Sequence, residues 1–133
     1  YFENQIVRLY TNKELQKEEI KTLFIEFYKK FGKEYSTLKS TEYANLINKE
    51  FNRIVIKDVS TRWGSCSTKN NLNYNYKLFM APIEVVNYVI AHEVAHLKHH
   101  NHSKKFWNEV ESIYPNYKKY RKWLKQNGNL LSL

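Results

Sequence analysis

The segment from Ile83 to Leu97 constrains the fold more than any other part of the chain, because it is apolar on nearly every side of a helix. Pro82 stands just before it, at a position that favours the first turn of a helix, and Glu84 complements the positive end of the helix dipole. A helix that is apolar on all sides cannot lie on a protein surface. We therefore expect a central, buried helix with the other elements packed around it.

Three polar residues interrupt this helix: His92, Glu93 and His96. Together with Val94 and Ala95 they form the pattern H-E-x-x-H. Residues four apart are separated by about 6 Å along a helix and about 40° around it, so both imidazoles project from one face. Two imidazoles on one face can bind a single Zn²⁺ ion, for which this spacing is typical. Glu93 lies one position further round, where it would flank the metal and act as general base towards an activated water.

A catalytic zinc usually has three protein ligands, so a third residue must lie nearby. His102 is the first candidate, because Asn101 can adopt a left-handed turn that ends the helix and Ser103 can cap the next one. His99 and His100 are the alternatives. Both would lie more simply in the last turn of the helix, where a protonated imidazole complements the dipole.

All 5 histidines fall between positions 92 and 102, which a scatter of ordinary surface histidines does not explain. The alternative interpretation is a helix with two histidines of the core. Burying two imidazoles and a carboxylate on an apolar helix is costly without a partner, however. The pattern therefore favours a metal site.

Further helices are expected on both sides of this segment. Thr11 and Glu14 have the spacing of a capping box, and apolar residues then recur at helical spacing until Gly32. A weaker pattern predicts a second helix from about 40 to 51. Towards the C-terminus, residues 104–114 form an amphipathic pattern stopped by Pro115, and residues 116–127 form another that is closed by Gly128.

The segment from Arg53 to Ser67 has the β-branched and aromatic residues that suit strands. The Asn70-Asn71 pair predicts a turn, after which Leu72, Tyr74 and Tyr76 alternate with asparagines in the pattern of a half-buried strand. We expect two antiparallel strands here, so the fold class is α+β, with a small antiparallel sheet packed on several helices.

Length and composition predict one domain over residues 1–133. The formal net charge of +9 is compatible with nucleic acid as a partner, but a Lys-rich genome would produce the same excess. Cys66 is the only cysteine, which suits a reduced, cytoplasmic protein. No apolar run is long enough to span a membrane, so no membrane partner is expected. The oligomeric state stays open.

Several motifs together resemble the YgjP-like metallopeptidase domain family. They are Ser60-Thr61-Arg62-Trp63-Gly64-Ser65-Cys66, Leu72-Asn73, Ala81-Pro82, Tyr88-Val89-Ile90, His92-Glu93-Val94-Ala95-His96 and Asn101-His102-Ser103-Lys104-Lys105-Phe106-Trp107. Their order and spacing match throughout, and Pro115-Asn116-Tyr117 and Trp123-Leu124 extend the likeness almost to the C-terminus.

This resemblance implies a zincin-like domain, related in general plan to SprT-like peptidases, with His102 as third zinc ligand and Glu93 as general base. Family members usually have a further β-rich segment upstream, which we expect this chain to lack or to have lost. The metzincin pattern is not met, because His99 stands where that pattern has glycine.

Arg62 and Trp63 are candidates for substrate binding, since a strand from Val59 to Cys66 near the active helix could pair with an extended peptide. The alternative is that Trp63 belongs to the core and Arg62 pairs with an acid or with carbonyl groups. Cys66 is interpreted as a small buried residue rather than a ligand or nucleophile. Tyr74, Tyr76 and Tyr88 are candidate donors to an oxyanion, which the sequence does not rank.

The leading hypothesis is a zinc-dependent metallopeptidase that cleaves a peptide or protein substrate. The alternatives are a DNA-associated protease of SprT-like habit and a non-catalytic binding module that contains zinc.

Overall fold

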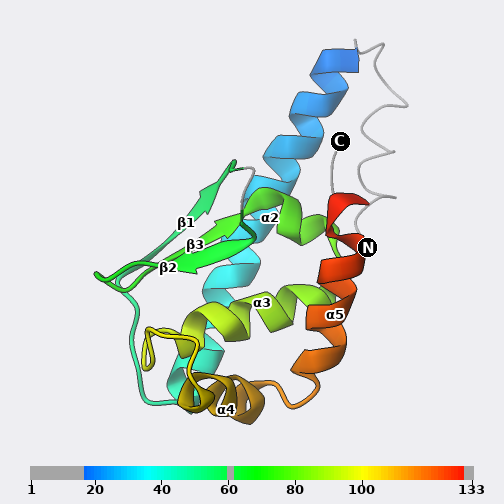
Figure 1. The fold of residues 1–133 in the computed structure, drawn as a ribbon. Helices are drawn as coiled ribbons and strands as arrows, with labels where there is room; N and C mark the ends of the chain where they lie inside the picture. Colours follow the sequence, from blue (N-terminus) through cyan, green and yellow to red (C-terminus); the bar gives the residue numbers. More distant parts are fainter. Residues whose placement is uncertain (1–16, 60–61, 131–133) are drawn as a thin grey trace.

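The computed structural model describes residues 17–59 and 62–130, as helices and a small sheet (Figure 1). In chain order the elements are α2 (Lys17–Leu46), β1 (Arg53–Lys57), β2 (Gly64–Cys66), β3 (Asn71–Asn75), η1 (Tyr76–Met80), α3 (Ile83–Ala95), α4 (Lys104–Ile113), α5 (Tyr117–Asn127) and η2 (Gly128–Leu130), where η denotes a 3-10 helix. The expected α+β class is confirmed. The capping box at Thr11 and Glu14 lies outside the described residues.

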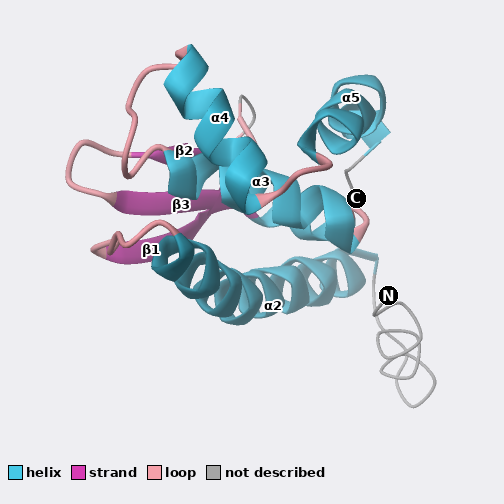
Figure 2. Ribbon diagram, turned by 90° about the horizontal axis from the view of Figure 1, so that it is seen from below, coloured by secondary structure: helices cyan, strands magenta, loops and turns pink. Residues whose placement is uncertain are grey.

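The helix α3 occupies the centre, as its apolar sequence predicts. Nine of its 13 residues are buried. It contacts α2, α4, α5 and β2, and Figure 2 shows it between α2 on one side and α4 and α5 on the other. The helix ends at Ala95 through a tightened turn, in which the N–H of His96 donates to the carbonyl of Glu93. His92 and His96 are therefore carried by the most enclosed element of the described chain.

The prediction of two N-terminal helices separated near Gly32 is wrong. A single helix, α2, runs without a break from Lys17 to Leu46. Small residues at Gly32, Ser36, Ser40 and Ala44 recur every four positions on its buried face. A Cβ at Gly32 would lie only 2.5 Å from Cδ2 of Phe79, so this glycine provides close packing and not a helix stop.

The sheet is mixed, which corrects the prediction of a purely antiparallel sheet. Its strand order is β1-β3-β2, with β1 parallel to β3 and β2 antiparallel to β3. The strand β2 returns the chain between β1 and β3, so these two strands run in the same direction. A period-two pattern carries no information about that direction. The predicted turn is confirmed, since Asn70 has a left-handed backbone with φ 61°.

The C-terminal helices follow the predicted boundaries within one residue. Ser103 caps α4, its side chain accepting a hydrogen bond of 3.3 Å from the N–H of Phe106. Gly128, however, does not end α5 in a left-handed conformation: its φ is −57°, and the chain continues into η2. Within the described residues, no helix has the length and apolar character needed to cross a bilayer.

Candidate metal centre and active site

The side chains of His92, His96 and His102 meet at one place. His92 lies in the last turn of α3, His96 is the residue that caps this helix, and His102 precedes the cap of α4. One ring nitrogen from each lies within 4.8 Å of the others. The ring centroids are 5.0 Å apart for His92 and His96, 5.3 Å for His92 and His102, and 4.8 Å for His96 and His102.

Hydrogen bonding orients the buried imidazole of His96. Its Nδ1 lies 3.0 Å from the backbone carbonyl oxygen of His99, which can only accept a hydrogen bond. Nδ1 therefore carries the proton, and Nε2 is left with a lone pair. Burial, in addition, lowers the pKa of His96 and so favours the neutral ring. Three imidazole nitrogens around one point fit a divalent metal such as zinc.

The histidine cluster is held by aromatic rings on α4. Phe106 is fully buried, stacks on His96 at 4.3 Å between centroids, and contacts His92 and His102 at 4.9 and 5.1 Å. Trp107 lies 5.5 Å from His92. Because Ser103 sets the start of α4, the same short segment fixes both His102 and these rings.

Asn101 does not adopt the predicted left-handed turn. Among the described residues other than glycine, only Asn48 and Asn70 have positive φ. The chain leaves α3 through successive turns at residues 96–98 instead. His102 reaches the cluster nevertheless. His99 is turned towards α4, where its Nε2 lies 3.4 Å from Oε1 of Glu109, and His100 is exposed.

Glu93 lies beside the cluster with only 5% of its surface exposed. Its Oε2 is 3.2 Å from Nδ1 of His92. The strand β2 passes directly over it: a Cβ at Gly64 would lie 2.9 Å from Cγ of Glu93 and 3.2 Å from the backbone oxygen of Asn73. The carboxylate thus occupies space that any other residue at position 64 would fill.

Comparison with known proteins identifies the family of this chain. Residues 3–127 match the sequence profile of the YgjP-like metallopeptidase domain. The chain belongs to this family. The resemblance of its motifs is thereby confirmed, and the histidine cluster is part of a YgjP-like metallopeptidase.

Two solved structures are similar to this YgjP-like metallopeptidase. The crystal structure of the metallopeptidase zymogen of Pyrococcus abyssi abylysin has a TM-score of 0.60 and 21% identity, over 68% of this chain and 93% of that one. The metallopeptidase zymogen of Methanocaldococcus jannaschii jannalysin has a TM-score of 0.57 and 24% identity, over 71% of this chain and 96% of that one. At these identities the likeness shows the fold alone. No curated protein matched the chain.

Arg62 and Trp63 immediately precede β2 and have different surroundings. Arg62 is exposed and lines a cavity on the sheet, while its carbonyl oxygen accepts a hydrogen bond of 3.3 Å from Nδ2 of Asn75. Trp63 is half-buried and packs near Gly128, where a Cβ would lie 3.0 Å from its Cζ2. Their role in substrate binding stays a prediction.

The three candidate tyrosines differ in position. Tyr74 is fully buried and its hydroxyl lies 3.0 Å from that of Ser40 on α2, and burial raises its pKa. Tyr76 belongs to η1. The ring of Tyr88 contacts a site imidazole, with its centroid 6.0 Å from that of His92, and burial raises the pKa of Tyr88 to about 12.

Cys66 on β2 is half-buried, so it is more accessible than expected. Burial, and then the charge of Glu93, raise the pKa of its thiol to about 11. The group is protonated near neutral pH and makes a poor nucleophile or ligand there, as interpreted from the sequence.

Sequence reasoning missed two residues of the site. The sequence predicts Phe106 as part of a family motif and of the apolar face of a helix but gives it no place at the metal, yet it contacts all three imidazoles. Gly64 was noted only within a motif. Its position next to Glu93 depends on how β2 crosses α3, which no local pattern reveals.

Proposed function

We propose that this metallopeptidase is zinc-dependent and that Glu93 is its general base. The observation that carries the proposal is the convergence of three imidazole nitrogens next to a buried carboxylate. His92, His96 and His102 would hold the zinc ion. When bound there, zinc acts as a Lewis acid on a peptide carbonyl and makes a water acidic enough to deprotonate near neutral pH.

The residues of the chain divide the remaining tasks. Glu93 would take a proton from the attacking water and return it to the leaving amine. The carbonyl of His99 keeps Nε2 of His96 available. Phe106 and Trp107 pack against the imidazoles from the α4 side and would hold them in position for the metal.

The substrate would lie along β2. This strand is at an edge of the sheet and contacts α3, and its residue Gly64 lies against Glu93. An extended peptide that pairs with this edge would be recognised mainly through its backbone. We propose a cytoplasmic peptidase of peptides or unfolded protein segments, in keeping with a single cysteine that cannot form an intrachain disulfide.

Metal analysis and one substitution test the proposal. We expect one equivalent of zinc in the purified protein and its loss in His92→Ala and in His102→Ala. Glu93→Gln should retain zinc, while peptide hydrolysis falls by about 10² to 10⁴. Retained hydrolysis in Glu93→Gln would refute the role of the base. Because both similar structures are of zymogens, zinc content is measured independently of activity.

A second candidate function is proteolysis in association with nucleic acid. A cationic surface on α5 supports it. The cations Lys118, Arg121, Lys122 and Lys125 recur at helical spacing on α5 and border a common depression. None of the ion pairs within the described residues involves this helix. Such a stripe would suit a phosphate backbone.

A further inference from the structure

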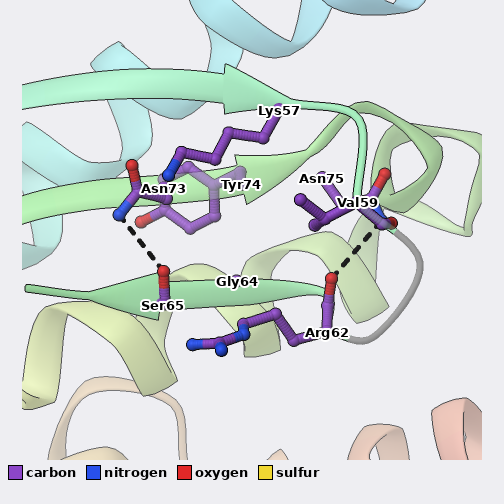
Figure 3. A pocket seen from close by; sticks show the side chains of 8 residues that line it. All are labelled: Lys57, Val59, Arg62, Gly64, Ser65, Asn73, Tyr74 and Asn75. Atoms are coloured by element: carbon purple, nitrogen blue, oxygen red, sulfur yellow. Dashed lines mark hydrogen bonds between the residues drawn. The ribbon is translucent and has the colours of Figure 1, made fainter.

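A cavity of about 220 Å³ lies on the sheet next to the proposed active site (Figure 3). It is lined by Lys57, Val59, Arg62, Gly64, Ser65, Asn73, Tyr74 and Asn75. These residues come from the ends of β1 and β3 and from the edge strand β2 with the segment before it. The proposed zinc chemistry makes no use of this cavity.

Donors of hydrogen bonds dominate the lining. The side chains of Lys57 and Arg62 run in the same direction along the sheet in Figure 3, on either side of Asn73 and Ser65. Nδ2 of Asn73 donates to Oγ of Ser65 at 3.1 Å, so the hydroxyl proton of Ser65 can be donated to a ligand. No acidic side chain is among the described residues that line the cavity.

The wall that carries Arg62 is held in place by a buried amide. Asn75 is 5% exposed, and its Nδ2 donates to the carbonyl oxygens of Val59 at 2.6 Å and of Arg62 at 3.3 Å. Its Oδ1 accepts from the N–H of Lys77 at 3.0 Å. The main chain on both sides of the cavity is therefore tied to β3, which reduces the ordering that a ligand would require.

Gly64 separates the cavity from the carboxylate of Glu93. By strand register, Lys57, Ser65 and Asn73 share one face of the sheet, whereas a Cβ at Gly64 would point to Glu93 on the opposite face. Because the side chains of an extended peptide alternate between the two faces, a peptide paired with β2 that directs one residue towards Glu93 would direct its neighbour towards Lys57 and Arg62. Two cations with hydroxyl and amide donors are suited to a carboxylate.

We propose that this cavity binds a carboxylate of the peptide substrate, close to the bond that is cleaved. The carboxylate belongs either to an acidic side chain or to the C-terminus of the peptide. The role of this site in substrate binding rests on the proposed peptidase function, but the binding of a carboxylate can be measured without any hydrolysis.

Three small probes separate the two sources. N-acetylglutamate amide carries only the side-chain carboxylate, N-acetylglutamine carries only the terminal one, and N-acetylglutamine amide carries neither. Each is titrated into zinc-loaded Glu93→Gln protein while the NMR signals of Ser65, Asn73 and Asn75 are followed. We expect saturable shifts with one or both acids. Equal shifts with the uncharged amide, or none with any probe, would overturn the proposal.

Substitutions then assign the binding to the two cations. The double variant Lys57→Gln, Arg62→Gln should bind the acidic probe about fivefold to tenfold or more weakly, because two charged donors are lost. Lys17→Gln with Lys21→Gln is the matched control, because these exposed cations lie on α2 away from the cavity and the change in net charge is the same. An equal loss of affinity in both double variants would show that net charge alone attracts the acid, and it would contradict a specific site at the cavity.

A cleavage assay distinguishes this inference from the proposed function. Peptides that differ only by Glu and Gln at each flanking position are compared, and the ratio of their cleavage rates is measured. We expect the ratio to favour glutamate at one position and to fall to about one in the Lys57 and Arg62 variant. Cleavage without any such preference would refute the carboxylate site and leave the peptidase standing. Probe binding without cleavage would instead support the site, and the zinc analysis would then test the metal centre separately.

Discussion

Gly64 has no side chain, and this leaves room beside β2 for the side chain of Glu93. The nearest obstacles to a Cβ are Cγ of Glu93 at 2.9 Å and the backbone oxygen of Asn73 at 3.2 Å. The backbone oxygen belongs to a paired strand and cannot yield, so the carboxylate must move. The position of a general base relative to its substrate is critical on the scale of an ångström.

Gly64→Ala should therefore lower peptide hydrolysis at least about tenfold while zinc stays bound, and lower the free energy of unfolding by about 1–3 kcal/mol. Steady-state kinetics, zinc analysis and urea unfolding measure these quantities. Gly32→Ala is the control, because a Cβ there would meet Phe79 at 2.5 Å, and the rings that Phe79 contacts are those of Phe31 and Tyr74. It should lose stability and keep activity. Equal activity in both variants would contradict the assignment of Gly64.

The titration of His96 should make the stability of the metal-free protein depend on pH. Burial lowers its pKa below the ordinary value of 6.5, whereas the unfolded chain keeps that value. The unfolded state therefore binds a proton more readily, and the stability that His96 contributes is present above about pH 6.5 and is lost as the pH falls through the folded-state pKa.

Urea unfolding of chelator-treated protein between pH 7.5 and 5 should show this loss. The free energy of unfolding is expected to decrease as the pH falls below about 6.5. In His96→Gln, which has no titrating group at this position, the decrease should be smaller. An identical pH dependence in the two proteins would mean that other groups cause it.

At the scale of single elements, α2 illustrates how small residues allow close packing. The stripe of Gly32, Ser36, Ser40 and Ala44 faces the core, and both serines are fully buried. Their hydroxyl groups differ. Oγ of Ser40 lies 3.0 Å from the hydroxyl of Tyr74, whereas Oγ of Ser36 has no hydrogen-bond partner among the described residues. An unsatisfied buried hydroxyl is destabilising.

Ser36→Ala should raise the free energy of unfolding by about 1 kcal/mol, because it removes this hydroxyl and adds a residue that favours helices. Ser40→Ala is the matched substitution one turn along and should lower it by about 1 kcal/mol, since Tyr74 loses its partner. Both are measured by urea unfolding at constant pH. The same sign for the two variants would contradict the hydrogen-bond assignment.

For the molecule as a whole, the distribution of positive charge matters more than the net value of +9. The helix α5 has five cations and no acid in 11 residues. Arg121 also lies over Trp107, 4.4 Å from the ring centre, and Trp107 in turn lies next to His92. The cationic stripe is therefore continuous with the proposed active site, so a polyanion bound on α5 would lie beside it.

Binding of duplex DNA tests this surface. Lys118→Gln, Lys122→Gln and Lys125→Gln together should weaken binding at low salt by about tenfold or more and reduce the slope of log K against log salt by about one per lysine. Fluorescence anisotropy with labelled DNA measures both. The control carries Lys17→Gln, Lys21→Gln and Lys30→Gln, which are exposed on α2. Equal weakening, or no binding by the unchanged protein, would remove the second candidate function.

The sequence by itself determined the features that depend on local spacing. An apolar helix must be buried, so the central position of α3 followed from residues 83–97 alone. The spacing of His92 and His96 likewise required two imidazoles on one face. The start of α4 at Ser103 was predictable because capping is a local hydrogen bond.

Only the tertiary structure decided the features that join distant segments. Gly32 was expected to end a helix, but its contact with Phe79 made it a packing position instead. The parallel pairing of β1 with β3 depends on the path of the chain through β2, which a period-two pattern leaves undetermined. Gly64 contacts Glu93, and Phe106 contacts three imidazoles, because separate elements pack together there. Local sequence patterns do not determine such contacts between distant parts of the chain.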